Sequence, residues 1–113
     1  MQLKEHILFD SLFAIYGSLL TERQNRVVCL HVRDDLSLSE IAEQLGITKQ
    51  AVSDALTAAR AKLSDYEEKL HLLELSQEVE KLILLIKQDD NISRDLYIQA
   101  DRVSAVMKDS EEE

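Results

Sequence analysis

The chain has 113 residues and carries 13 Lys and Arg against 22 Asp and Glu, so its formal net charge is −9. Apolar residues make up 45% of the chain, which is enough to bury one core. Two Gly, no Pro and 4% aromatic residues exclude sandwiches, barrels and Rossmann-type sheets, which need turn residues and aromatic or β-branched runs. The composition therefore predicts an all-α protein.

The sequence carries no feature of a membrane or secreted protein. No apolar run approaches the ~20 residues that a bilayer span needs. The polar residues 1–6 precede only a short apolar stretch, unlike a signal peptide. The single Cys29 cannot form an intrachain disulfide and fits a reducing compartment. We therefore expect a cytoplasmic protein that does not associate with membranes.

Apolar spacing predicts a first helix over residues 3–18. Its apolar residues recur at spacings of four and three, which defines one helical face: Leu8, Leu12, Ile15 and Leu19, widened by Phe9, Phe13 and Tyr16. A second helix should begin at Thr21, because Thr21 and Gln24 fit a capping box. This helix is apolar on most sides, so we expect it to be the central one, with Cys29 as a small buried hydrophobe.

The middle of the chain predicts two further helices. Ser37 and Glu40 form a second capping box, and Gly46 follows the helix where a left-handed residue is needed. Thr48 then caps a long fourth helix that should run to about residue 73. Its apolar residues repeat every seven positions, as in a helix-pairing seam: Val52, Leu56, Ala59, Leu63, Tyr66, Leu70 and Leu73.

The C-terminal part continues the helical pattern in a new phase. We expect a kink near residues 74–77, followed by an apolar row of Leu75, Val79, Leu82 and Ile86. A last helix should span residues 92–107, after a break at residues 89–91. The expected organisation is a helix-turn-helix domain over residues 1–73 and an acidic helical segment over residues 74–113. Residues 1–63 hold 7 basic and 8 acidic residues, whereas residues 64–113 hold 6 and 14.

Residues 38–57, LSEIAEQLGITKQAVSDALT, contain the one informative motif. Ala42 is small where two helices cross, Gly46 permits a tight turn, and Thr48 caps the second helix. Together with apolar residues at Ile41 and Val52, these features predict a helix-turn-helix. An αα-hairpin used only for packing is the alternative interpretation.

Residues 20–63 resemble region 4 of bacterial sigma factors, in which a helix with a hydroxyl cap and a glutamine precedes the helix-turn-helix. Adding four flanking segments extends the resemblance to residues 7–73 and to the YlxM family of Gram-positive bacteria: Tyr16–Thr21, Asp34–Ala42, Lys49–Val52 and Asp65–His71. This resemblance implies an all-α fold, no catalysis and a role in the signal recognition particle pathway. The implied partners are the particle's RNA, its GTPase, or both.

In a DNA-reading helix-turn-helix, the first exposed turns of the second helix contact base edges. The candidate nucleic-acid-binding residues at these positions are Thr48, Lys49, Gln50, Ser53, Asp54 and Thr57. Lys49 suits guanine or phosphate, and Gln50 suits adenine. Arg60 and Lys62 lie further along and suit the phosphate backbone. Recognition helices of sigma factors are usually more basic, so strong promoter binding is not expected.

Two alternatives stay open at this point. The first is a dimeric, sequence-specific DNA-binding regulator, and the second is an adaptor that uses the helix-turn-helix only as a scaffold. The seam over residues 56–73 is either intramolecular core or a homodimer surface along the long helix. Arg23, Arg26 and Arg33 lie on one side of the second helix, as a basic patch or as ordinary solvated charges.

The sequence holds no recognisable catalytic or metal-binding motif. His6, His31 and His71 lie far apart and lack ligand spacing. With two glycines in the chain, a phosphate cradle made of backbone amides is hard to build. We therefore expect no enzyme activity, no metal and no cofactor.

Overall fold

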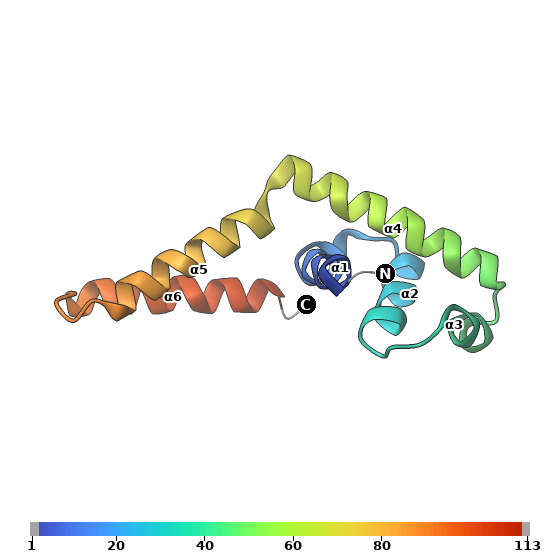
Figure 1. Cartoon of the computed structure of the whole chain (residues 1–113), viewed down its shortest axis with the longest axis horizontal. Coiled ribbons are helices and arrows are strands. Elements are labelled where there is room, and N and C mark those ends of the chain that lie inside the picture. Colours follow the sequence, from blue (N-terminus) through green and yellow to red (C-terminus); the bar gives the residue numbers. More distant parts are fainter. Residues whose placement is uncertain (1–2, 112–113) are drawn as a thin grey trace. The chain divides into compact units, whose positions relative to one another are not determined.

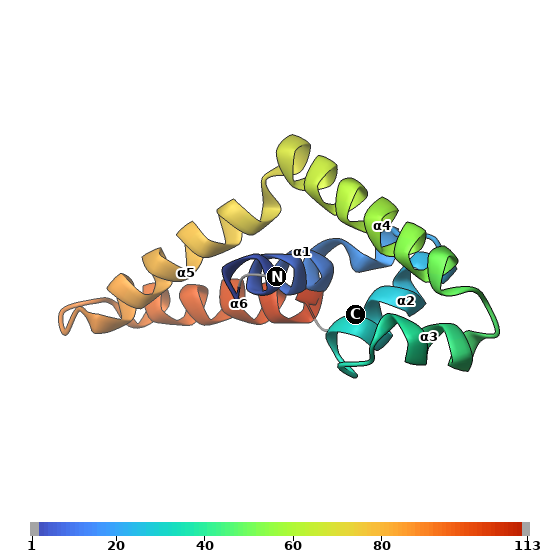
Figure 2. The same cartoon turned by 45° about the vertical axis from the view of Figure 1, so that its right-hand side comes forward.

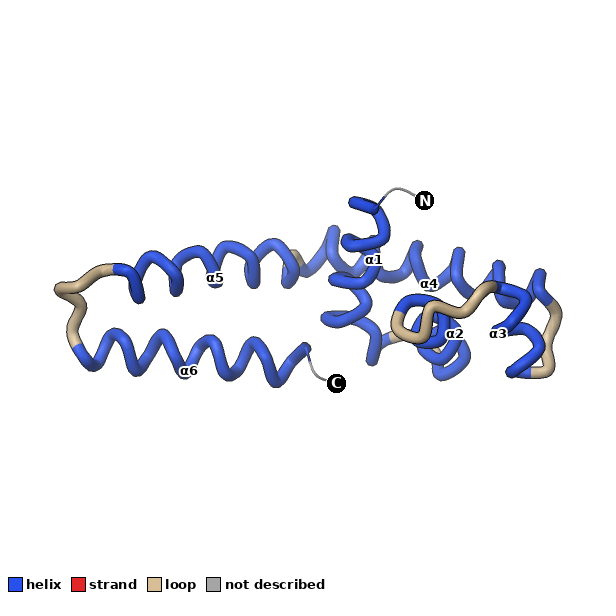
Figure 3. The backbone as a smooth tube through the Cα atoms, turned by 60° about the horizontal axis from the view of Figure 1, so that its bottom comes forward, coloured by secondary structure: helices blue, strands red, loops and turns tan. Residues whose placement is uncertain are grey.

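A computed structural model describes residues 3–111, and within this range all regular structure is helical (Figures 1 and 3). The chain divides into two compact units between Leu70 and His71. The first unit holds α1 (Leu3–Tyr16), the 3-10 turn η1 (Gly17–Leu19), α2 (Glu22–Val32), α3 (Leu38–Leu45) and α4 (Lys49–Leu70). The second unit holds α5 (Leu72–Gln88) and α6 (Arg94–Glu111). The all-α prediction is confirmed.

Capping boxes begin α2 and α3 at the predicted residues. The Thr21 hydroxyl accepts a hydrogen bond from the Gln24 N–H at 3.2 Å, and the Gln24 side chain accepts one from the Thr21 N–H at 3.1 Å. Ser37 and Glu40 form the same pair of bonds at 3.1 and 3.0 Å. These bonds satisfy amide groups that a helix start leaves without partners. The bonds from the Ser37 backbone N–H and from its side chain lower the pKa of Glu40.

The core of the first unit forms where α4 packs against α1, α2 and α3 (Figure 2). Val27 and Val28 on α2 are fully buried, but the helix that packs against all the others of this unit is α4 and not α2, which we expected to be central. The buried residues of α4 are Val52, Leu56, Ala59 and Leu63. This part of the seven-residue repeat is therefore intramolecular core, and it is not available for pairing with a second copy along the long helix.

The prediction for the inner face of α1 is partly wrong. The buried residues are Phe9, Leu12, Phe13 and Tyr16, whereas Leu8 and Leu19 are 51% and 53% exposed. Apolar residues surround much of this helix, so spacing did not decide which row faces inward. The aromatic row offers the larger apolar area, and its burial therefore stabilises the fold more. Leu19 also leaves the helical phase, because the chain tightens into η1 after Tyr16.

The long helix ends earlier than predicted. We expected it to reach residue 73 with a kink at 74–77, but α4 stops at Leu70 and α5 starts at Leu72. His71 between them is left-handed, with φ of 56°. Its ring nitrogen lies 3.3 Å from a Glu74 carboxylate oxygen. A non-glycine residue seldom adopts this conformation, so the sequence carries no ordinary stop signal there.

The second unit is an antiparallel pair of helices, and α5 and α6 lie side by side along their length (Figure 3). The last helix runs from Arg94 to Glu111 instead of over residues 92–107. Its start is capped by the Ser93 hydroxyl, which accepts from the Leu96 N–H at 3.1 Å. Ala100 is the one buried side chain among residues 71–108. The pair therefore has a half-buried seam and little core of its own.

Candidate nucleic-acid interface

A tight turn joins α3 to α4 as the motif predicts. Gly46 adopts the left-handed conformation with φ of 68°, which costs a residue without a Cβ little. The Ile47 N–H donates to the Ala42 carbonyl at 3.1 Å, which closes the end of α3. The Thr48 hydroxyl then accepts from the Ala51 N–H at 3.0 Å and caps α4. These bonds set the two helices of a helix-turn-helix in place.

Apolar residues hold the two helices of the motif together. Ile41 and Val52 are fully buried, and Ala42 is 8% exposed. Leu45 and Ile47 are half-buried at the turn itself. Both helices pack on α2, so the polar side of α4 is left facing outward.

The predicted contact residues occupy this outward side. Thr48, Lys49, Gln50, Asp54 and Thr57 are exposed, and Ser53 is half-buried. Within residues 3–111, the Lys49 ammonium makes no hydrogen bond or ion pair, so its charge is available to a ligand. The Gln50 amide nitrogen donates to an Asp54 oxygen at 2.9 Å. Because this bond is exposed, water or a nucleic-acid base can replace it.

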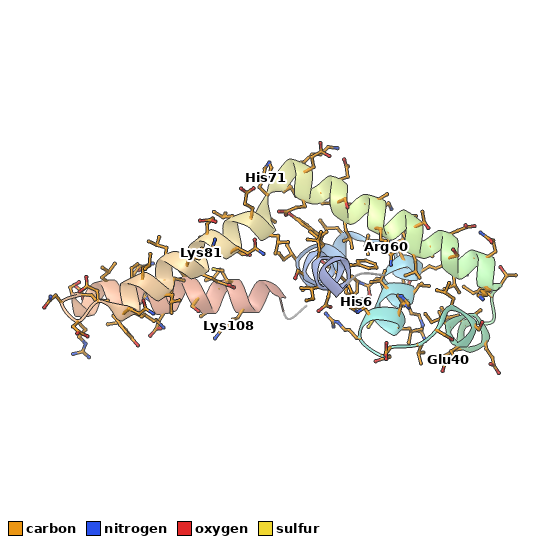
Figure 4. All side chains as sticks on the ribbon, in the orientation of Figure 1. His6, Glu40, Arg60, His71, Lys81 and Lys108 are labelled. Atoms are coloured by element: carbon orange, nitrogen blue, oxygen red, sulfur yellow. The ribbon has the colours of Figure 1, made fainter. Side chains whose placement is uncertain are left out.

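The two predicted backbone contacts, Arg60 and Lys62, have partners inside the first unit. The Arg60 guanidinium lies 4.8 Å from the centre of the Phe9 ring of α1 (Arg60 is labelled in Figure 4). The half-buried Lys62 ammonium donates to the Gln24 side chain of α2 at 3.2 Å. Lys62 thus ties α4 to the capping box of α2. Arg60 keeps an exposed surface, and a phosphate role for either residue stays a prediction.

The three arginines in and directly after α2, Arg23, Arg26 and Arg33, separate in the structure. The Arg33 guanidinium lies 5.3 Å from the centre of the Phe13 ring, so it belongs to the packing around α1. Arg23 and Arg26 are exposed and line a surface hollow together with Leu45 of α3. From the sequence, the three were either one basic patch or ordinary solvated charges. The structure instead brings Arg23 and Arg26 to the edge of the helix-turn-helix.

The positive charge around the motif is modest and mixed with acids. Glu22 lines the same hollow as Arg23 and Arg26. Asp54 lies among the contact residues of α4, and Glu40 and Glu43 are exposed on α3 (Glu40 is labelled in Figure 4). An interface of this kind can hold a few phosphates, but it cannot supply the field of a strongly basic DNA-binding domain.

Other sites raised by the sequence show ordinary packing. Cys29 is half-buried instead of buried, as the wall of a second hollow on α2. The His31 ring nitrogen Nδ1 lies 3.0 Å from the Leu36 carbonyl oxygen. In the described part of the chain, no three His, Cys, Asp or Glu residues gather as metal ligands would. None of the described helices combines the length and apolar character needed to cross a bilayer.

Comparison with known proteins places the chain in a family. The model of the UPF0122 family, described as "Putative helix-turn-helix protein, YlxM / p13 like", matches residues 3–103. UPF0122 proteins of Bacillus cereus (strain AH187) and Bacillus anthracis (strain A0248) are 47% identical over 77 residues, which is 68% of this chain and 70% of each relative. The range that the family model matches, residues 3–103, contains α3, the turn and α4. The chain therefore belongs to the UPF0122, YlxM / p13-like family of helix-turn-helix proteins.

Proposed function

We propose that this protein is a non-enzymatic, cytoplasmic regulator that binds nucleic acid through its helix-turn-helix. The observation that carries the proposal is the exposed first turn of α4, where Thr48, Lys49 and Gln50 face outward beside a turn of helix-turn-helix geometry. Lys49 supplies a positive charge that no group of the described chain neutralises. Arg23 and Arg26 add charge at the edge of the same surface.

The nucleic acid that we propose is the RNA of the signal recognition particle, with the particle's GTPase as a second partner. Resemblance to YlxM proteins supports this choice, and so does the weak charge of the interface. Each neutralised phosphate contributes about 0.9 to the salt slope of binding to duplex DNA and about 0.7 for single strands, whereas strong binders make ~6–10 contacts. Lys49, Arg23 and Arg26 supply three available cations. So few cations fit a protein that binds RNA within a larger complex, where another component contacts the RNA as well.

The direct test is fluorescence anisotropy with labelled particle RNA, alone and with the GTPase present. We expect binding that tightens when the GTPase is added and weakens in Lys49→Ala. Lys69→Ala is the matched control, because Lys69 lies on the same helix but pairs with Asp65 at 3.0 Å. A GTPase assay run in parallel measures regulation. No association with RNA or GTPase, together with an unchanged GTPase rate, would reject this proposal.

A dimeric, sequence-specific DNA-binding regulator is the second candidate. It is favoured by the adjacent exposed side chains of Lys49 and Gln50, which suit guanine and adenine in the major groove. Selection from a random DNA pool at low salt should then enrich two half-sites about 34 Å apart. Lys49→Ala with Gln50→Ala should abolish the enrichment. If no sequence emerges from the pool, this candidate is ruled out.

A further inference from the structure

The second unit exposes an unusual amount of apolar surface for a two-helix hairpin. Ala100 is its one buried side chain among residues 71–108. Five leucines of this unit expose about half their surface or more: Leu75 at 57%, Leu82 at 56%, Leu84 at 58%, Leu85 at 66% and Leu96 at 46%. Helix pairs of this size rarely bury enough apolar area to be stable alone and usually depend on a further contact.

A polar contact marks one side of this hairpin. The Lys87 ammonium of α5 pairs with the Asp101 carboxylate of α6 and lies 5.1 Å from the centre of the Tyr97 ring. The hydrogen bond from Lys87 to Asp101 raises the pKa of Lys87, so the ammonium stays charged there. These three residues therefore occupy the polar side of the hairpin.

Helical spacing puts four of these leucines, all except Leu84, on the opposite side. Residues three, four and seven apart share a helix face, so Leu75, Leu82 and Leu85 lie together on α5, turned away from Lys87. By the same spacing, Leu96 and the half-buried Val103 share the side of α6 turned away from Asp101. We name these five residues the hairpin face: Leu75, Leu82, Leu85, Leu96 and Val103.

We propose that the hairpin face binds the hairpin face of a second copy of this chain, so that two α5–α6 pairs form a four-helix bundle. Charge supports a second copy over a basic or acidic partner. Glu78 lies on the same side of α5 as Leu75 and Leu82, and it already pairs with Lys81 at 3.2 Å. A cation of the same helix thus neutralises Glu78, and a locally neutral, mainly apolar surface is complementary to a second copy of itself.

The dimensions of the face also suit a dimer. Helices of 17 and 18 residues are about 25 Å long, and two adjacent helices are about 20 Å wide. Their flat footprint is on the order of 500 Å² per partner, or about 1,000 Å² in total, which is the lower end of the area that a specific interface buries. The dimer would thereby use α5 and α6 instead of the buried seam of α4.

The chain offers a matched pair of variants to test this dimer. Leu82 and Leu84 are 56% and 58% exposed on the same helix, but Leu84 lies on nearly the opposite side of α5 from Leu82. Leu82→Lys puts a charge into the hairpin face, and Leu84→Lys puts the same charge outside it. The measurement is sedimentation equilibrium of the full chain over a wide concentration range, against a monomer mass of 12.9 kDa.

We expect the wild type and Leu84→Lys to sediment at twice the monomer mass, and Leu82→Lys to dissociate with a Kd raised about 30-fold or more. Circular dichroism shows whether each variant keeps its helices. If Leu82→Lys does not fold, the pair Leu82→Ala and Leu84→Ala replaces it, with a smaller loss expected only for Leu82→Ala. A monomeric wild type, or equal behaviour of the two positions, would overturn the proposal.

Discussion

The phenol of Tyr16 donates a 2.6 Å hydrogen bond to the Glu67 carboxylate, which joins α1 to the end of α4 across 51 residues of sequence. Tyr16 is 1% exposed, so its ring belongs to the core while its hydroxyl reaches a charged group at the edge. The Tyr66 ring packs at a tilt beside it, with ring centres 5.8 Å apart. The contacts of Tyr16 with Glu67 and Tyr66 set where α1 lies on α4.

Removing this hydroxyl should lower the stability of the first unit. Tyr16→Phe keeps the ring and its packing but deletes a bond to a charged acceptor, so we expect a loss of about 1–2 kcal/mol in the free energy of unfolding. Urea denaturation followed by circular dichroism measures it. The control is Tyr66→Phe, whose exposed bond to the Leu19 carbonyl is 3.4 Å long. It should cost less than about 0.5 kcal/mol, and equal losses in both variants would contradict this assignment.

A side chain at Gly46 should strain the turn of the helix-turn-helix. The φ of Gly46 is 68°, and a Cβ there would meet no atom within 4 Å, so the cost lies in the backbone alone. Gly46→Ala should therefore destabilise the protein by about 1–2 kcal/mol. Gly46→Asn should cost less, because Asn tolerates the left-handed region. Thermal unfolding of both variants makes the comparison, and an Ala variant as stable as the wild type would rule out the strain.

The capping carboxylate of Glu40 predicts a pH-dependent contribution to stability. Hydrogen bonds from the Ser37 backbone and side chain lower the pKa of Glu40 below 4.5 in the folded chain. A carboxylate with a lowered pKa stabilises the fold above its unfolded pKa, and this contribution is lost as the pH falls through the folded value. The wild type should therefore lose stability relative to Glu40→Gln between pH 7 and pH 3.

The comparison between wild type and Glu40→Gln uses urea midpoints at the two pH values. Glutamine keeps an oxygen acceptor for the Ser37 N–H but does not titrate, so it isolates the charge. Glu43→Gln serves as the control, since it removes an exposed carboxylate of the same helix without a capping contact. A wild-type advantage over Glu40→Gln that is equal at both pH values would contradict the prediction.

The salt dependence of nucleic-acid binding should report Lys49 directly. If Lys49, Arg23 and Arg26 each neutralise one phosphate, the slope of log affinity against log salt is about −2 to −3. Lys49→Ala should then reduce the magnitude of the slope by ~0.7–0.9. Lys69→Ala should leave it unchanged, since Lys69 pairs with Asp65 far along α4. Titrations at several salt concentrations measure the slopes, and an unchanged slope in Lys49→Ala would remove Lys49 from the interface.

Local signals in the sequence were enough to predict the helix-turn-helix. Capping residues such as Thr21 and Ser37, and the glycine at position 46, act through hydrogen bonds and backbone sterics within a few residues. The starts of α2, α3 and α4 follow from such short-range chemistry, and so does the turn between α3 and α4. The outward position of Lys49 and Gln50 follows from the same register.

Tertiary packing decided what these local signals leave open. Choosing Phe9 over Leu8 as the inner residue of α1 depends on the surface that α4 presents, because both residues are apolar. The left-handed His71 ends α4 without any residue that ordinarily stops a helix. Arg33 stacks on Phe13 and is thereby separated from Arg23 and Arg26. Apolar spacing indicates which residues can be buried. Which of them are buried depends on the helix that packs against them, and that helix lies far away in the sequence.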